Sequence, residues 1–215
     1  MSKVCKMLVA SIDSEAVEEV IYKHATHVHV GQMSVEESVW PIADPALFLS
    51  DDVEPTIFSL KVLEQKFVEI QYNSFGKNRS LSKNISQALN TQVVVNIYQS
   101  VTEACYWAFY DNGEEKRVIE FGDGQLLQND GAKLPFENQP LGYNIGEEIS
   151  RKEFYVFDMD DMERYNHHVG IEALVYHEFG EGWKMIRCVP LEKIKGVGIK
   201  WLDSLKFWKR GKINR

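Results

Sequence analysis

The chain has 215 residues, of which 44% are hydrophobic and 26% charged, and its formal net charge is −8. These values are typical of a globular protein with one sizeable core and argue against a disordered chain. No apolar run approaches the roughly 18 residues of a membrane-spanning helix, and we expect no signal peptide. The three cysteines are odd in number and far apart, which favours a reduced, cytoplasmic protein.

Charge is unevenly distributed along the chain. The segment 193–215 contains eight Lys or Arg residues and one acid, Asp203, so the rest of the chain is strongly acidic. An acidic surface repels phosphate backbones and attracts cationic groups. We therefore expect a protein partner, preferably a basic one, and do not expect nucleic acid.

The N-terminal segment predicts a strand and a helix that packs on it. Residues 4–12 are typical of a strand, and Asp13 or Ser14 is placed to cap the helix that follows. The alternating residues 27–30 predict a second strand, which ends at Gly31.

The next segment predicts a loop, two strands and a helix. The proline-bearing residues 32–56 are typical of a long surface loop with one short helix. Residues 57–63 and 67–75 have strand character, the second with clear alternation of apolar and polar side chains. Residues 80–89 follow with a helical apolar stripe.

The segment 76–80 precedes that helix and superficially resembles a phosphate-binding loop. The Walker pattern is absent, because Gln71 stands where its first glycine belongs and no Ser or Thr follows Lys77. We therefore expect Ser80 to cap the helix, and Lys77 and Arg79 to be exposed charges.

The clearest pattern is an antiparallel meander centred on 92–128. Residues 104–110 are apolar at every position, which predicts a central strand covered on both faces. Residues 111–113 (Asp-Asn-Gly) predict a tight hairpin, because Asn and Gly tolerate the positive φ of such turns. Residues 123–124 and 129–131 predict further turns. The fold class is therefore α+β, an antiparallel β-sheet with packed helices.

The C-terminal third returns to mixed structure. Residues 153–157 predict a short strand, and Asp158 is placed to cap a helix that Gly170 interrupts. Helical spacing resumes at 171–178, and 183–189 predict another strand.

These elements favour a single domain over residues 1–215. Glycine and proline cluster near 135–143, which marks a possible sub-boundary. The segment 193–215 predicts a basic amphipathic C-terminal helix, whose apolar stripe runs through 199–210. That stripe suits docking on the acidic body, a partner protein or an anionic membrane surface. Its candidate partner-binding residues are Trp201, Leu205, Trp208 and Lys209.

Histidines supply the one candidate metal site. His24, His27 and His29 lie close together in sequence, and His27 and His29 would share one face of a strand. Neutral imidazole is a good ligand for zinc and related divalent metals. The alternative is two histidines on the outer face of an edge strand. Candidates for a third ligand are Asp13, His177 and Glu178.

Other partial motifs do not indicate catalysis. His177-Glu178 begins like the HExxH zinc motif, but Gly182 does not supply its second histidine. Residues 158–161 suit a helix N-terminus better than a calcium loop. Glu114 and Glu115 are expected at an exposed hairpin tip without partners. Burial should leave Cys105 unreactive.

Three fragments carry a family resemblance: Ala-Leu-Asn-Thr at 88–91, Tyr-Trp-Ala-Phe-Tyr-Asp-Asn-Gly at 106–113, and Gly-Ala-Lys-Leu-Pro-Phe-Glu at 131–137. Through them, residues 81–137 resemble small acidic bacterial proteins of uncharacterised role, of the kind encoded with secreted toxins as immunity factors. The resemblance implies a protein partner and transfers no catalytic residue.

The sequence therefore favours a non-enzymatic protein-binding module, of the immunity type, that neutralises a basic bacterial toxin by direct binding. It predicts no cofactor. One alternative is a metal-dependent enzyme that uses His27 and His29. The other is a peripheral membrane protein that attaches through 199–210.

Overall fold

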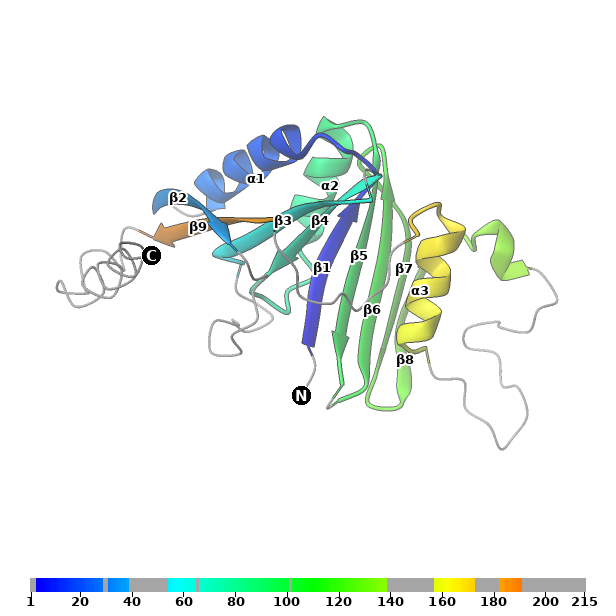
Figure 1. Cartoon of the computed structure of the whole chain (residues 1–215). Helices are drawn as coiled ribbons and strands as arrows, with labels where there is room; N and C mark the ends of the chain where they lie inside the picture. The colour runs from blue at the N-terminus through cyan, green and yellow to red at the C-terminus, as the bar shows by residue number, and fades with distance from the viewer. Residues whose placement is uncertain are drawn as a thin grey trace, which may run out of the picture.

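A computed structural model of the chain describes residues 3–28, 31–38, 54–64, 66–100, 102–138, 157–172 and 182–190. Within them, nine strands form one sheet in the order β2-β9-β3-β4-β1-β5-β6-β7-β8, and every neighbouring pair is antiparallel. The strand direction turns steadily from β8 to β9 (Figure 1), as expected of a twisted sheet. The α+β class with an antiparallel sheet is confirmed.

The elements have the following bounds. The strands are β1 (Lys3–Val9), β2 (Gly31–Ser38), β3 (Ile57–Leu63), β4 (Phe67–Tyr72), β5 (Gln92–Gln99), β6 (Ala104–Asp111), β7 (Glu114–Gly122), β8 (Gln125–Gly131) and β9 (Trp183–Pro190). The helices are α1 (Ser14–Val28), α2 (Arg79–Ala88), the 3-10 helix η2 (Pro135–Asn138) and α3 (Met159–His168).

Local capping explains where two helices begin. The Ala16 amide donates to Asp13 Oδ1 at 2.9 Å, so Asp13 caps α1 as predicted. Asp158 and Asp161 form a reciprocal capping box at the start of α3, which confirms the helix-start interpretation of that acidic run. The prediction for α2 was wrong. Its cap residue is Asn78, with φ 46° and no side-chain capping bond, and the helix is already under way at Ser80.

The predicted meander is present as β5 to β8. Strand β6 is buried along its whole central stretch, with alternate side chains in two cores. Asn112 and Gly113 both have positive φ (51° and 78°), so the β6–β7 hairpin forms where the sequence predicts it. Residues 129–131 were expected to form a turn but belong to β8, because they continue its pairing with β7.

The strand predicted at 27–30 was also wrong. Residues up to Val28 continue α1, and Gly31 begins strand β2 instead of ending one. Strand β2 pairs along its full length with β9, which lies between β2 and β3. The sheet therefore joins the segment 183–190 to strands far earlier in the chain. Residues 29–30 lie outside the described part.

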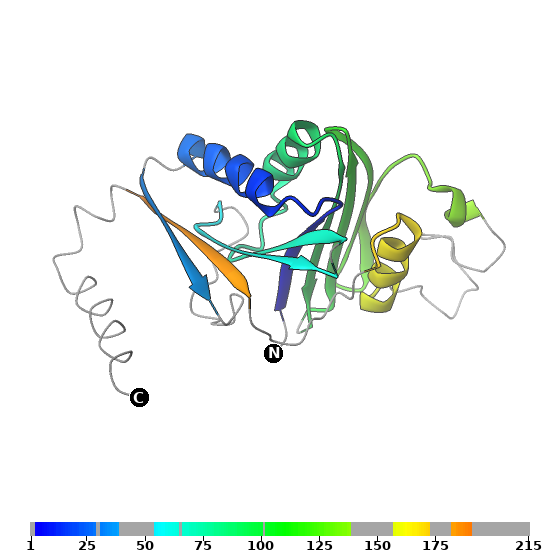
Figure 2. The same cartoon turned by 45° about the horizontal axis from the view of Figure 1, so that its top comes forward.

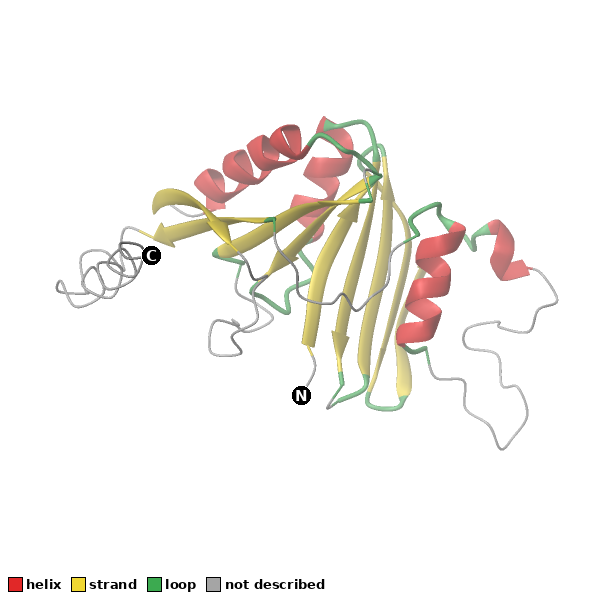
Figure 3. Ribbon diagram, viewed as in Figure 1, coloured by secondary structure: helices red, strands yellow, loops and turns green. Residues whose placement is uncertain are grey.

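Helices cover both faces of the sheet (Figures 2 and 3). The face beneath α1 and α2 is the larger core, and α3 covers part of the opposite face, where Trp107 Nε1 donates to Asn166 Oδ1 at 2.9 Å. Central members of the first core are Met7, Ile21, Ile70, Leu81, Val95 and Ala108. Central members of the second are Leu8, Val94, Trp107, Ile119, Phe157 and Met162.

Several predictions fall on residues outside the described part. These include the strand at 153–156, most of the helix at 171–178 and the basic helix within 193–215. Of the possible boundary at 135–143, the described residues form η2, which ends at Asn138. None of the described helices combines the length and the apolar character needed to cross a membrane.

Candidate functional site

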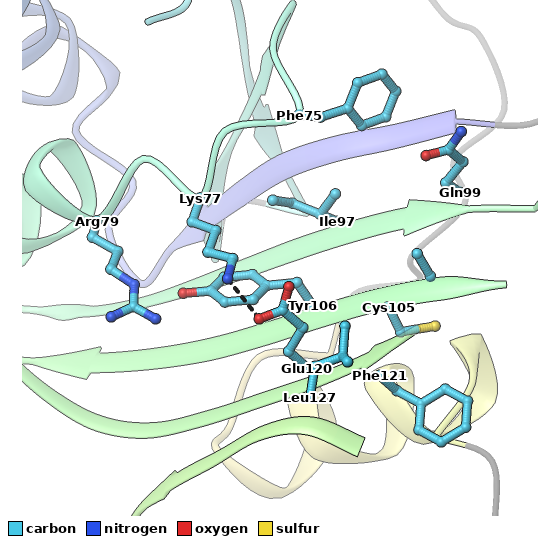
Figure 4. Close-up of a pocket in the computed structure, with 11 residues that line it drawn as sticks. Phe75, Lys77, Arg79, Ile97, Gln99, Cys105, Tyr106, Glu120, Phe121 and Leu127 are labelled. Carbon is cyan, nitrogen blue, oxygen red and sulfur yellow. Dashed lines mark hydrogen bonds and ion pairs between the residues drawn. The ribbon is translucent and has the colours of Figure 1, made fainter. Parts of the chain in front are cut away.

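A cavity of about 380 Å³ opens on the face of the sheet that carries α2. Its walls come from the segment before α2 and from β5, β6, β7 and β8 (Figure 4). Apolar side chains form much of the wall: Phe75, Ile97 and Leu127. A cavity of this size, with apolar walls and a few polar groups, has the general character of a binding site.

The polar end of this cavity is built around Tyr106. The Lys77 ammonium lies 5.3 Å from the centroid of the Tyr106 ring and 2.5 Å from Glu120 Oε2. Figure 4 shows this arrangement, with the Lys77 nitrogen over the ring and Glu120 beside it. The Lys77 side chain is 39% exposed and that of Glu120 22%, so solvent reaches the pair. A cation, an aromatic ring and a carboxylate therefore meet at the mouth.

A second, similar group lies next to the first. Arg79 Nη1 is 3.8 Å from Glu115 Oε1, and the Tyr110 hydroxyl donates to Glu115 Oε2 at 2.8 Å. Arg79 also donates from Nη2 to Gln128 Oε1 at 2.7 Å. Arg79 lines both the first cavity and a second one of about 550 Å³, which Tyr110 and Glu115 also line.

The two cavities therefore adjoin at Arg79. We name them together the charged groove. It is defined by Lys77, Arg79, Tyr106, Tyr110, Glu115 and Glu120.

Two β-bulges place side chains in the groove. Phe109 pairs with Arg117 whereas Tyr110 pairs with Glu115, so Lys116 is an extra residue in β7. Side chains alternate between faces along a strand, and the extra residue lets Glu115 share a face with Tyr110.

Leu127 is the extra residue of the second bulge, in β8. Glu120 pairs with Gln128 and Phe121 with Leu126, which leaves Leu127 without an opposite residue. Leu127 is 52% exposed and lines the first cavity. The bulge therefore presents an apolar side chain to solvent at the mouth of the groove.

Burial makes the potential acids of the groove poor proton donors. Burial raises the pKa of Tyr106. Burial, the neighbouring Tyr106 and the hydrogen bond to Glu115 together raise the pKa of Tyr110. Burial also raises the pKa of Cys105, whose side chain lies in the second core behind the first cavity, to about 12. The sequence-based expectation of an unreactive Cys105 thiol agrees with this direction, since the thiolate is the nucleophile.

The predicted histidine site lacks its expected strand. His27 lies in the last turn of α1, and His29 lies outside the described residues. His24 is 8% exposed, and its Nε2 lies 3.6 Å from Glu54 Oε2. Of the suggested third ligands, Asp13 caps α1. In the ranges that the structure describes, no three His, Cys, Asp or Glu side chains converge as metal ligands would.

The other predicted site residues cannot be placed. Trp201, Leu205, Trp208 and Lys209 all lie outside the described part of the chain, as do His177 and Glu178.

Sequence reasoning missed the groove. Arg79 is exposed as expected and Lys77 is partly exposed, but Glu115 is not the unpaired acid that the sequence predicted. Lys77 pairs with Glu120 and Arg79 with Glu115, each across about forty residues of sequence. The only local signal was the pair of cations at 77 and 79, and this pair does not predict which acids they contact.

Comparison with known proteins adds no relative. No protein-family model, no curated protein and no solved structure matches this chain.

Proposed function

We propose that this protein is a non-enzymatic binding protein that captures a single protein partner by direct contact. The partner class we propose is a basic bacterial toxin, which makes the chain an immunity-type protein. The observation that carries the proposal is the charged groove, in which two carboxylates are paired with cations and tyrosines at a solvent-accessible surface.

The groove is better suited to binding than to acid–base chemistry. Tyr106, Tyr110 and Cys105 have pKa values raised by burial, so each keeps its proton at neutral pH. Glu115 accepts a hydrogen bond from Tyr110 and Glu120 lies against Lys77. General bases and nucleophiles need pKa values close to the working pH. Burial moves the pKa values of these three residues away from neutral pH.

The same groups suit exchange with a partner. Partly exposed ion pairs contribute roughly 0–1 kcal/mol, so replacing one by a pair with the partner costs little. Aromatic residues and an exposed leucine beside them supply the apolar contacts that interface centres require. The net charge of −8 would attract a basic partner over distance.

The test is isolation of the partner followed by calorimetry on the purified pair. We expect one basic protein to bind at equal stoichiometry, with an association rate that falls as salt rises. The double variant Glu115→Gln/Glu120→Gln should bind at least about tenfold more weakly, because two charge pairs to the partner are lost.

The matched control is Glu18→Gln, which removes an acid of α1 that pairs with Lys184 of β9, away from the groove. This variant should bind as the unmodified protein does. Equal binding by the groove variant and the control, or salt-insensitive binding to every basic protein tried, would exclude the proposal.

A further inference from the structure

We propose that the charged groove binds a cationic side chain, the guanidinium or ammonium of an arginine or lysine on the partner, and that Lys77 holds this position in the free protein. The inference rests on the proposed function and specifies which chemical group is recognised and where. The incoming cation would take the place of Lys77 over Tyr106 and beside Glu120.

The site already binds a cation of its own chain. Two interactions that recognise cations converge there: the face of an aromatic ring, at 5.3 Å from the Lys77 nitrogen, and a carboxylate, at 2.5 Å. Tyr106 is 3% exposed, and Glu120 of β7 pairs directly with it across the β6–β7 ladder, so the sheet holds both groups in place without the lysine. The protein therefore supplies a preformed cation site.

Lys77 is placed to leave this site. Its side chain is 39% exposed, and it stands in the segment before α2, outside helix and strand. Displacement would move the ammonium into water and leave the described backbone hydrogen bonds of α2 and the sheet unchanged. The cost is that of one partly exposed ion pair and one cation–ring contact.

The neighbouring cavity has room for the incoming side chain. Its volume of about 380 Å³ is far larger than an ammonium group, and it extends past Ile97 and Leu127. The methylene stem of an arginine or lysine packs well on apolar surface while its charged head stays polar. An arginine entering along these walls would bring its guanidinium to Tyr106 and Glu120.

An anion is the competing ligand for the same groove. Lys77, Arg79 and the Tyr106 hydroxyl, which lies close to Arg79, could each contact an anion. Glu120 and Glu115 already lie against Lys77 and Arg79, and the chain as a whole carries −8. Both repel an anion, so the balance of charge favours the cation.

The test titrates the full chain with small probes and follows NMR signals of Tyr106, Ile97 and Leu127. The probes are N-acetyl-arginine methylamide, its neutral citrulline analogue and N-acetyl-glutamate methylamide. We expect saturable shifts with the arginine probe alone. Lys77→Gln, which empties the site, should tighten that binding about threefold, and Glu120→Gln should weaken it about tenfold.

The control variant is Lys184→Gln, which removes a lysine paired with Glu18 away from the groove. It should leave the arginine affinity unchanged. Weaker arginine binding by Lys77→Gln, or saturable shifts with the glutamate probe only, would show an anion site and overturn the inference. Absence of shifts with every probe would overturn it too.

The same variants separate this inference from the proposed function. If Glu115→Gln/Glu120→Gln weakens binding of the protein partner but Lys77→Gln and Glu120→Gln alone leave its affinity unchanged, the cation site is refuted and partner capture stands. If the arginine probe behaves as expected and no protein partner exists, the cation site stands and partner capture is refuted.

Discussion

Arg117 and Glu137 form a bidentate ion pair inside the protein. Arg117 Nε donates to Glu137 Oε1 and Arg117 Nη2 to Glu137 Oε2, each at 2.9 Å, and the side chains are 1% and 3% exposed. Arg117 also donates to the Asp130 carbonyl, and Glu137 accepts from the Leu134 amide. This one ion pair therefore connects β7 to β8 and to η2, in which Glu137 lies.

Removing only one member of this pair should destabilise the fold strongly. Glu137→Gln leaves the Arg117 guanidinium buried without a counter-charge, and we expect a loss of about 3–5 kcal/mol in the free energy of unfolding. Urea unfolding followed by circular dichroism measures it. The double variant Arg117→Met/Glu137→Leu should lose less than Glu137→Gln, because no charge stays buried. An equal or larger loss would show that the charge pairing is not what matters.

Cys105 should make stability fall at alkaline pH. Burial raises its pKa in the fold to about 12 from the usual value of 9.0. The unfolded chain releases the thiol proton first as pH rises. The stabilising contribution is therefore complete below pH 9 and is lost between pH 9 and about 12, by at most about 1.4 kcal/mol per pH unit.

The comparison with Cys105→Ala isolates this effect from other groups that titrate in the same range. The variant should be less stable at neutral pH, because a buried side chain is shortened. Its unfolding free energy should then fall less steeply with pH above 9 than that of the unmodified protein. Parallel pH curves for the two proteins would contradict the prediction.

The start of α3 depends on Asp158. Its carboxylate accepts from the Asp161 amide at 3.0 Å, so Asp158→Ala should cost about 1 kcal/mol of stability. Asp158→Asn keeps an acceptor at this position and should cost clearly less. Thermal unfolding of the two variants measures the difference. Equal losses would mean that the capping bond is not the stabilising element.

Gly113 is required by both backbone and space. Its φ is +78°, and a Cβ at this position would lie 2.7 Å from Gln87 Cβ. Gly124 has a similar φ of +72° with nothing within 4 Å of the same added atom. Gly124→Ala should therefore cost about 1 kcal/mol from backbone strain alone, and Gly113→Ala more than that. Chemical unfolding that gave the reverse order would refute this explanation.

The two tyrosines of the charged groove should respond differently to loss of their hydroxyls. Tyr110 donates to Glu115 at 2.8 Å, whereas the buried Tyr106 hydroxyl lies near Tyr110 and Arg79 without a hydrogen bond of comparable geometry. Tyr110→Phe should cost about 1 kcal/mol, and Tyr106→Phe should cost clearly less. Urea midpoints measure both. An equal or larger loss for Tyr106→Phe would contradict this order.

The starts of α1 and α3 and the β6–β7 hairpin have local causes, and the sequence predicted all three. Asp13 and Asp158 cap the helices that follow them, and Asn112-Gly113 forms the predicted hairpin. The unbroken apolar run of β6 also predicted a strand buried on both faces. In each case the decisive interaction, a capping bond, a positive φ or burial of a continuous run, lies within a few residues.

Local sequence patterns gave wrong predictions where the same short pattern is compatible with two kinds of secondary structure. Residues 27–30 alternate like a strand, yet α1 continues to Val28. A pattern of only four residues is too short to distinguish the last turn of a helix from a strand. The residues Asn129-Asp130-Gly131 are common in turns, and so this short run predicted a turn. Pairing with β7 outweighs the low strand preference of these residues.

The composition, the charge, the caps of α1 and α3 and the meander were determined by the sequence itself. Only the tertiary structure decided that β9 lies between β2 and β3, and that Lys77 and Arg79 meet Glu120 and Glu115. Both results join segments separated by dozens of residues. They depend on how the whole sheet pairs and on one extra residue in β7, which changes the face that a side chain occupies and leaves no periodic signal in the sequence.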